Sequence, residues 1–151
     1  MLKSMTMNTI YQEKSKQTTR IFLSYVAADR EYAHKLHNLL SQHSDLYIFT
    51  LEMLSAGDNW ESKLKDEISK SDIFIVLLSS RSVNSNWVLH ELGAAWALNK
   101  PIIPVVIHGD VFSQIPLPLR QMQLIEFKEF EKPEVINKIL EQYEKVETSS
   151  Y

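Results

Sequence analysis

The chain of 151 residues contains no cysteine and only three glycines. Without cysteine there is no disulfide framework, no thiol nucleophile and no thiolate metal site, and this composition suits a reducing compartment. The chain also has no glycine-rich phosphate loop of either common pattern. These absences argue against a secreted disulfide scaffold and against a dinucleotide site of the Rossmann type.

Long apolar runs and a strong net charge are missing as well. The longest apolar runs, Ile73–Leu78 and Ile102–Ile107, are far shorter than the ~20 residues of a membrane helix. The first residues lack the apolar core of a secretory signal. The formal charge of −3 provides no general attraction to nucleic acid or to an anionic membrane. We therefore expect a cytoplasmic protein with no nucleic-acid and no membrane partner.

Strand and helix patterns alternate along most of the chain. Short apolar segments predict strands at 20–25, 46–50, 73–78, 102–107 and 123–127. Segments of helical periodicity predict helices at 30–42, 60–70, 86–98 and 132–146, with a short helix in the region 108–120. This order predicts one α/β domain over residues 19–147 with a parallel sheet and right-handed crossovers. We expect residues 1–18 to form a flexible tail or linker, and residues 148–151 to form a short tail.

Several polar residues mark helix starts, and one proline marks a strand. Asp29 is the expected cap of the first helix, Asp58 or Asn59 of the second, and Ser85 or Asn86 of the third. Pro104 lies in an otherwise apolar run, which indicates an exposed edge or a strand end.

Glu91 is the only acidic residue between Asp72 and Asp110, and it falls on an apolar stripe of its predicted helix. A lone carboxylate in apolar surroundings carries a desolvation cost, so it needs a partner or a purpose. One interpretation is structural, with Glu91 at the stripe edge reaching water or pairing with Arg81 or Lys100. The other is functional. Apolar neighbours raise the pKa of such an acid and a helix N-terminus lowers it, so the pattern leaves the net direction open.

Ligands of open parallel sheets bind beyond the carboxyl ends of the strands. In this chain those ends are Ser24-Tyr25, Thr50-Leu51 and Ser79-Ser80. A receiver domain needs an acid at the end of the third strand to accept phosphate. Ser79 and Ser80 occupy that position here, which counts against a receiver domain. No G-x-S-x-G elbow supports a serine hydrolase, and the histidines form no convincing metal set.

Four segments, in this order and spacing, resemble a TIR domain (Toll/interleukin-1 receptor homology) across residues 19–146. They are IFLSYVAADREYAHKL, LEMLSAGDNWESKL, SDIFIVLLSSRSVNSNWVLHEL and KPIIPVVI. The resemblance implies a flavodoxin-like three-layer sandwich, with a five-stranded parallel sheet in the order 2-1-3-4-5 and helices on both faces. The pattern S-x-W-x-x-x-E at Ser85–Glu91 resembles bacterial TIR domains and the NAD-cleaving animal TIR domain.

The resemblance also implies an activity. Enzymatic members hydrolyse NAD+ at the nicotinamide–ribose bond, using a glutamate four residues beyond a tryptophan, and Glu91 after Trp87 fills that position. The products are nicotinamide and ADP-ribose or a cyclic ADP-ribose isomer. NAD+ is then a substrate, and no cofactor and no metal is expected. The substrate-binding candidates that the resemblance implies are Ser24, Tyr25, Leu54, Gly57 and Trp87.

The segment Leu51–Trp60 corresponds to the family's BB loop. The resemblance implies that this loop mediates self-association, that activity needs assembly, and that the module serves bacterial immune signalling such as antiphage defence. Further partners would be other TIR domains or a fused sensor domain. Two alternatives stay open, namely a non-enzymatic TIR–TIR interaction module and a virulence TIR domain that interferes with host signalling. At the residue level, Trp87 can line the site or fill the core, and the loop can be a plain surface turn.

Overall fold

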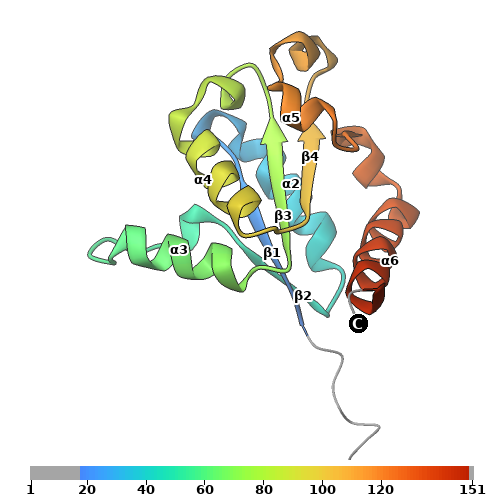
Figure 1. Cartoon of the computed structure of the whole chain (residues 1–151), viewed down its shortest axis with the longest axis horizontal. Coiled ribbons are helices and arrows are strands. Elements are labelled where there is room, and N and C mark those ends of the chain that lie inside the picture. The colour runs from blue at the N-terminus through green and yellow to red at the C-terminus, as the bar shows by residue number, and fades with distance from the viewer. Residues whose placement is uncertain (1–17, 150–151) are drawn as a thin grey trace, which may run out of the picture.

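A five-stranded parallel sheet forms the centre of the computed structural model, which describes residues 18–149 (Figure 1). Its strands are β1 (Thr19–Ser24), β2 (Leu46–Phe49), β3 (Ile73–Leu78), β4 (Ile102–Val106) and β5 (Ile125–Glu126). They lie in the order β2-β1-β3-β4-β5 with every pairing parallel. The predicted strand order is therefore confirmed.

Helices cover both faces of the sheet, as the three-layer prediction requires (Figure 1). The α-helices are α2 (Arg30–Ser41), α3 (Trp60–Lys70), α4 (Asn86–Ala97), α5 (Leu117–Arg120) and α6 (Pro133–Ser149). Short 3-10 turns complete the connections at η1 (Ala27–Asp29), η2 (Leu51–Met53), η3 (Ser82–Asn84), η4 (Gly109–Gln114) and η5 (Phe127–Glu131). Apolar side chains of α2 and α6 pack on one face, and those of α3 and α4 pack on the other. No helix within residues 18–149 has the length and apolar character needed to cross a bilayer.

Alternation along β1 decides which side chains meet which helices. Ile21 and Leu23 join the core under α2 and α6, whereas Phe22 joins the core under α3 and α4. Successive residues of a strand point to opposite faces, so Ser24 lies on the α4 side. Every residue of β3 is buried, as expected for the central strand of a covered parallel sheet.

The largest differences from the predicted bounds are at β5 and at the end of α6. β5 has two residues rather than the expected 123–127, and it pairs only with Val105 and Val106. At Pro104, β4 pairs with β3 alone, so this residue lies at an edge of the strand pairing, as its ring favours. The expected exposure is wrong, because Pro104 is buried. α6 continues to Ser149 and so includes two residues of the expected C-terminal tail. Most of the predicted N-terminal tail, residues 1–17, lies outside the described residues.

Two of the expected caps are made by side chains. The Ser85 hydroxyl accepts a hydrogen bond from the Val88 amide (3.3 Å), and the Asn59 carbonyl oxygen accepts one from the Ser62 amide (3.2 Å). The expectation for Asp29 is wrong, because its side chain makes no cap hydrogen bond although it stands at the N-cap position of α2. The Asp29 carboxylate binds a serine at the end of β3 instead.

Candidate active site

Glu91 projects from the inner side of α4 and is 1% exposed. Neither of its carboxylate oxygens has a hydrogen-bond partner among the described residues. Both structural interpretations of Glu91 are wrong, because its side chain does not reach water and pairs with no cation within residues 18–149. Lys100 donates to the Ser69 carbonyl (2.6 Å) instead, and Arg81 is exposed. The structure thus contains a buried acid with no structural partner.

Burial raises the pKa of Glu91 from 4.5 to about 7. Removing a carboxylate from water disfavours its charged form, and this effect exceeds the opposing influence of the nearby Ser24 hydroxyl and Trp87 indole. Neither of these donors comes into hydrogen-bonding geometry with the acid. The sequence left the net direction of the Glu91 pKa shift open, and in the structure desolvation determines it. Strongly shifted groups of this kind are typical of functional sites.

Ser24 ends β1 on the same side of the sheet and is 1% exposed. Its hydroxyl oxygen also lacks a partner among the described residues. Most buried polar atoms in proteins are hydrogen-bonded, so neighbouring unpartnered oxygens on Ser24 and Glu91 require an explanation. A ligand with hydroxyl groups would satisfy both side chains.

Trp87 lies one helical turn before Glu91, at the start of α4. Its side chain is 43% exposed, which excludes a role as a plain core residue. An exposed indole beside a buried acid provides a flat apolar surface on which a ring can stack.

Tyr25 faces the other side of the sheet, away from Glu91. It is 8% exposed and packs in the core formed with α2 and α6. Burial, reinforced by the nearby Glu52 carboxylate, raises the pKa of Tyr25 to about 12. The structure therefore separates Tyr25 from Ser24, although the two are adjacent in sequence. The alternation of side chains along a strand could have shown this separation.

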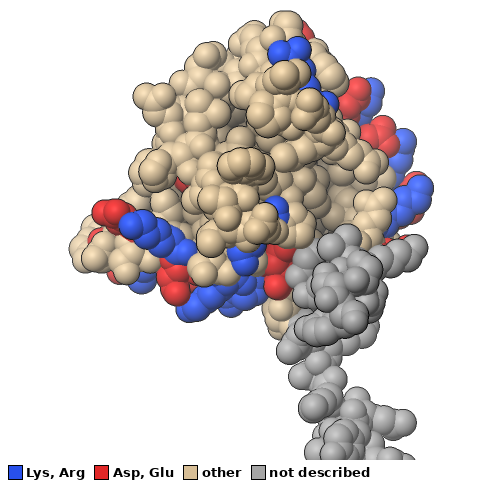
Figure 2. All heavy atoms as spheres, in the orientation of Figure 1, with Lys and Arg blue, Asp and Glu red and all other residues tan. Residues whose placement is uncertain are grey.

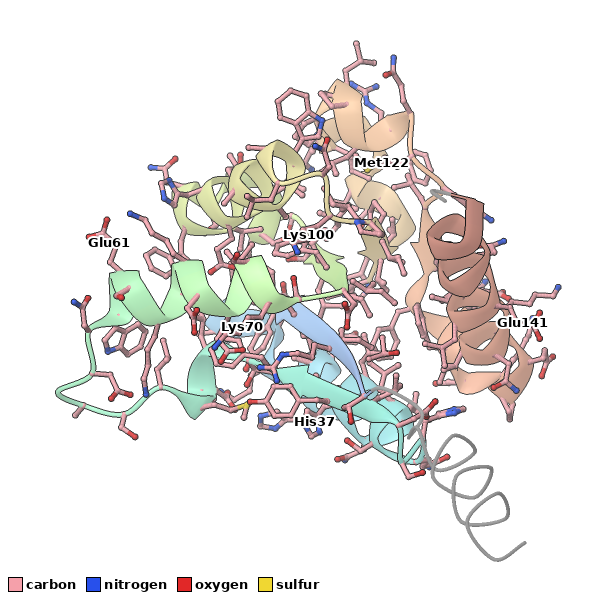
Figure 3. All side chains as sticks on the ribbon, turned by 60° about the horizontal axis from the view of Figure 1, so that its bottom comes forward. His37, Glu61, Lys70, Lys100, Met122 and Glu141 are labelled. Atoms are coloured by element: carbon pink, nitrogen blue, oxygen red, sulfur yellow. The ribbon has the colours of Figure 1, made fainter. Side chains whose placement is uncertain are left out.

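The BB loop, Leu51–Trp60, projects beyond the amino end of α3 (Figures 1 and 3). Its tip is a turn in which the Asp58 carboxylate accepts a hydrogen bond from the Ser55 amide (2.7 Å) and pairs with Lys63 (3.2 Å). Gly57 has φ of 94°, a conformation that strongly favours glycine. Leu54 is half-buried and packs against the core under α3 and α4. The loop thus packs against the core under α3 and α4 through Leu54 and exposes Gly57 at its tip.

Glu52 ties the start of this loop to α2, a contact that the sequence did not indicate. Its carboxylate pairs with Arg30 Nε (2.8 Å) and with His34 Nε2 (2.8 Å). The His34 hydrogen bond is the largest of the contacts that hold the pKa of Glu52 below its usual value. All of these groups are partly exposed, so we expect this cluster to orient the loop rather than to stabilise the fold strongly.

A second polar cluster joins the start of α2 to the end of β3 and was also missed. The Ser79 hydroxyl donates to the buried Asp29 carboxylate (2.5 Å) and accepts from the Ser82 amide (3.1 Å). The Ser82 hydroxyl in turn accepts from the Ser79 amide (2.8 Å). This network fixes the turn that leads from β3 into α4, and therefore the position of Glu91. In the sequence, only the expected adjacency of the first and third strands could have indicated this cluster.

Replacing Ser79 with alanine is expected to destabilise the domain by about 2–3 kcal/mol, because Asp29 would keep a buried carboxylate without its donor. Urea denaturation followed by circular dichroism measures this change. The matched control is Ser80→Ala, since Ser80 is exposed and adjacent. Equal losses in the two variants would contradict the structural role of the Ser79–Asp29 contact.

Comparison with known proteins agrees with this architecture. A family model described as TIR domain matches residues 21–140, and the chain belongs to that family. A search of curated proteins found no match. Solved structures extend the comparison to individual proteins.

The TIR domain of the Toll-related receptor TRR-2 from Hydra magnipapillata superposes with a TM-score of 0.66 at 17% identity, covering 82% of this chain and 97% of that one. A TIR-STING receptor from C. gigas in complex with 2′,3′-cGAMP gives a TM-score of 0.64 at 22% identity, covering 80% of this chain and 39% of that one. The Clostridium botulinum CMP N-glycosidase BcmB gives 0.54 at 17% identity, covering 76% and 93%. At these identities the likeness concerns the fold alone.

Proposed function

We propose that this TIR domain cleaves the bond between nicotinamide and ribose in NAD+, with Glu91 as the catalytic residue. One observation carries the proposal. Glu91 is a buried carboxylate without a structural partner, beside Ser24 and one turn after Trp87. It lies near the carboxyl ends of the strands, where ligands of open parallel sheets bind.

The chemistry of this bond suits a single acid. Departure of nicotinamide leaves an oxocarbenium-like ribose, and a fixed carboxylate in a water-poor site stabilises that cation. Nicotinamide leaves as a neutral molecule, so no general acid is needed. Glu91 acts in its ionised form, the Ser24 hydroxyl binds beside it, and Trp87 stacks on a ring of the substrate. Water completes hydrolysis to ADP-ribose, or the adenine of the same molecule attacks and gives a cyclic isomer.

Substrate access requires a conformational change, because the Glu91 side chain is 1% exposed. The apolar core on this face includes Phe22 and Val88, and Leu54 of the BB loop packs against it. Movement of the loop would therefore loosen the cover on the site. Self-association through the BB loop provides a cause for that movement, and it would link activity to assembly in an immune signalling module.

The proposal is tested by incubating the purified chain with NAD+, in solution and while concentrated on beads, and analysing the products by mass spectrometry. Release of nicotinamide with ADP-ribose or a cyclic isomer supports the proposal and names the product. Intact NAD+ under both conditions overturns it.

Replacing Gly57 with proline is expected to weaken self-association on the order of tenfold and to lower NAD+ cleavage with it. Proline fixes φ near −65°, which is incompatible with the 94° of this residue, so the turn must rearrange. Light scattering during gel filtration measures association, and circular dichroism verifies the fold.

Gly109→Ala is the matched control for this substitution. Gly109 has no positive φ, and an added Cβ would meet no atom within 4 Å. Unchanged association in Gly57→Pro, or an equal loss in Gly109→Ala, would contradict a role for the loop tip.

A second candidate function is a non-enzymatic interaction module, and the outer surface of α4 favours it. Figure 2 shows few charged atoms over α4, whereas charged side chains gather over α3. Large apolar side chains are exposed on α4 and nearby, with Trp96 at 68% and Leu117 at 61%. Such surfaces mark contact sites for other proteins. This alternative predicts partner binding that Trp96→Ser abolishes, with NAD+ left intact.

A further inference from the structure

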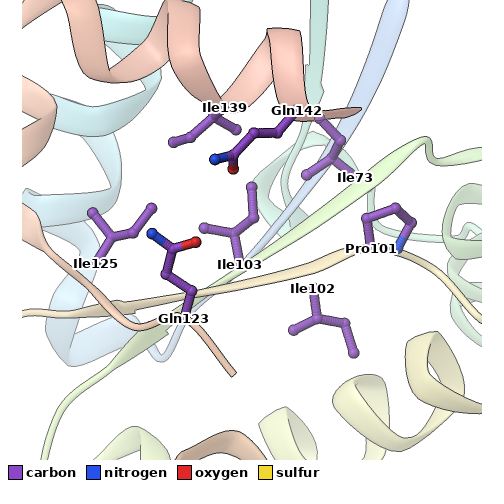
Figure 4. Close-up of a pocket in the computed structure, with 8 residues that line it drawn as sticks. All are labelled: Ile73, Pro101, Ile102, Ile103, Gln123, Ile125, Ile139 and Gln142. Carbon is purple, nitrogen blue, oxygen red and sulfur yellow. The ribbon is translucent and has the colours of Figure 1, made fainter. Parts of the chain in front are cut away.

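A separate cavity of about 170 Å³ lies at the opposite end of the sheet from Glu91. It contacts the first residues of β3 and β4, while Ser24 and Glu91 lie near the carboxyl ends of the strands. Its lining residues are Ile73, Pro101, Ile102, Ile103, Gln123, Ile125, Ile139 and Gln142 (Figure 4).

The cavity follows from the short pairing of β5. Because β5 pairs only with Val105 and Val106, the chain at Gln123 diverges from the amino half of β4. α6 bridges the resulting gap and contributes Ile139 and Gln142. The cavity opens to solvent, since Pro101, Gln123 and Gln142 of its lining are exposed. A second hollow of about 370 Å³ adjoins it and shares Gln123, Ile125, Ile139 and Gln142 with it.

The lining has a chemical character that restricts the ligand. Five isoleucines and one proline form the walls, and β-branched side chains hold their shape because they have few rotamers. None of the lining residues is charged, so an ionic ligand would lose hydration without gaining a counter-charge. The amides of Gln123 and Gln142 extend into the same space beside Ile103 (Figure 4). Each carboxamide offers both donors and an acceptor.

We propose that this cavity binds a small neutral heteroaromatic ring that carries a donor–acceptor edge, such as a carboxamide. The ring lies among Ile103, Ile125 and Ile139, and its polar edge pairs with the two glutamine amides. The volume fits one ring, since an engineered apolar cavity of about 150 Å³ takes up benzene. Nicotinamide belongs to this ligand class. If the proposed function holds, the cavity therefore binds a product of the reaction at a second site.

The test titrates the full chain, labelled at isoleucine methyl groups, with nicotinamide and records NMR spectra. We expect saturable shifts for Ile103, Ile125 and Ile139 and none for Ile48 or Ile115, neither of which lines the cavity. Nicotinic acid, the anionic analogue, is expected not to bind. Absence of saturable shifts at the cavity, or equal binding of nicotinic acid, overturns the proposal.

Substitutions distinguish the contribution of the amide contacts to ligand binding from that of the apolar walls. The double variant Gln123→Leu, Gln142→Leu keeps the size of the lining but removes two hydrogen-bonding groups, so its preference for nicotinamide over benzene is expected to fall on the order of tenfold. Gln121→Leu is the matched control, because Gln121 is exposed and does not line the cavity. An unchanged preference in the double variant contradicts the proposed pairing.

The Glu91→Gln variant tests whether ligand binding at the cavity is independent of the proposed catalytic site. The isoleucine shifts are expected to persist in Glu91→Gln, since Glu91 is not part of the cavity lining. Binding at the cavity in an unmodified chain that leaves NAD+ intact would support this inference while rejecting the proposed function. Loss of the shifts in Glu91→Gln would place the ligand elsewhere and overturn the inference.

Discussion

Glu91→Gln is expected to lower nicotinamide release from NAD+ on the order of a thousandfold, with the domain still folded. Glutamine keeps the size and position of the side chain but removes the negative charge that stabilises the ribosyl cation. The loss should fall on kcat, because the charge interaction is made only as the bond breaks. Nicotinamide release by the variant and the unmodified chain, both concentrated on beads, measures this effect.

Two further observations make the result specific to Glu91. Glu61→Gln is the matched control, since Glu61 is exposed on α3 and only pairs with Lys65. Because the pKa of Glu91 is about 7 and the ionised form acts, release by the unmodified chain is expected to fall about tenfold per pH unit below neutrality. Undiminished release by Glu91→Gln, or an equal loss in Glu61→Gln, would remove Glu91 from the mechanism.

Most of the fold could be predicted from the sequence because the local pattern and the tertiary environment agree. Ile73–Leu78 is apolar at every position and forms the buried central strand, and the predicted helix at 60–70 has the observed bounds. β5 is shorter than predicted because its length depends on where the chain diverges from β4. No local sequence pattern encodes the point of divergence, because pairing between distant segments determines it.

The candidate site was also predictable only where the local sequence pattern determines it, and not where contacts between distant segments do. A lone acid on an apolar stripe identified Glu91, but whether it reached water depended on how α4 packs against the sheet. Asp29 was expected to cap α2 because Asp is favoured before a helix. Its carboxylate instead meets Ser79, which is 50 residues away in the chain. Such contacts arise from the adjacency of β1 and β3, which the strand order could have indicated.

The same Glu91→Gln substitution is expected to stabilise the domain at alkaline pH, by about 3 kcal/mol at pH 8. Below pH 4.5 the carboxyl is protonated in both the folded and the unfolded chain, and it contributes no pH dependence. Between 4.5 and about 7 the unfolded chain ionises while the folded chain keeps its proton, so the stability of the unmodified protein falls as the pH rises. Above about 7 the full cost of a buried charge is present. Glutamine never ionises and avoids this cost.

Urea denaturation of both proteins at pH 5 and pH 8 measures this difference. The two unfolding free energies are expected to lie close together at pH 5 and to diverge at pH 8, and a difference that does not change with pH would contradict burial of an ionisable acid. The direction of the change in stability also shows how a loss of activity in Glu91→Gln should be interpreted. A structural residue lowers both stability and activity when it is replaced, whereas a catalytic acid held in an unfavourable environment lowers activity while stability increases. A domain that becomes more stable and less active on Glu91→Gln has therefore lost a catalytic group.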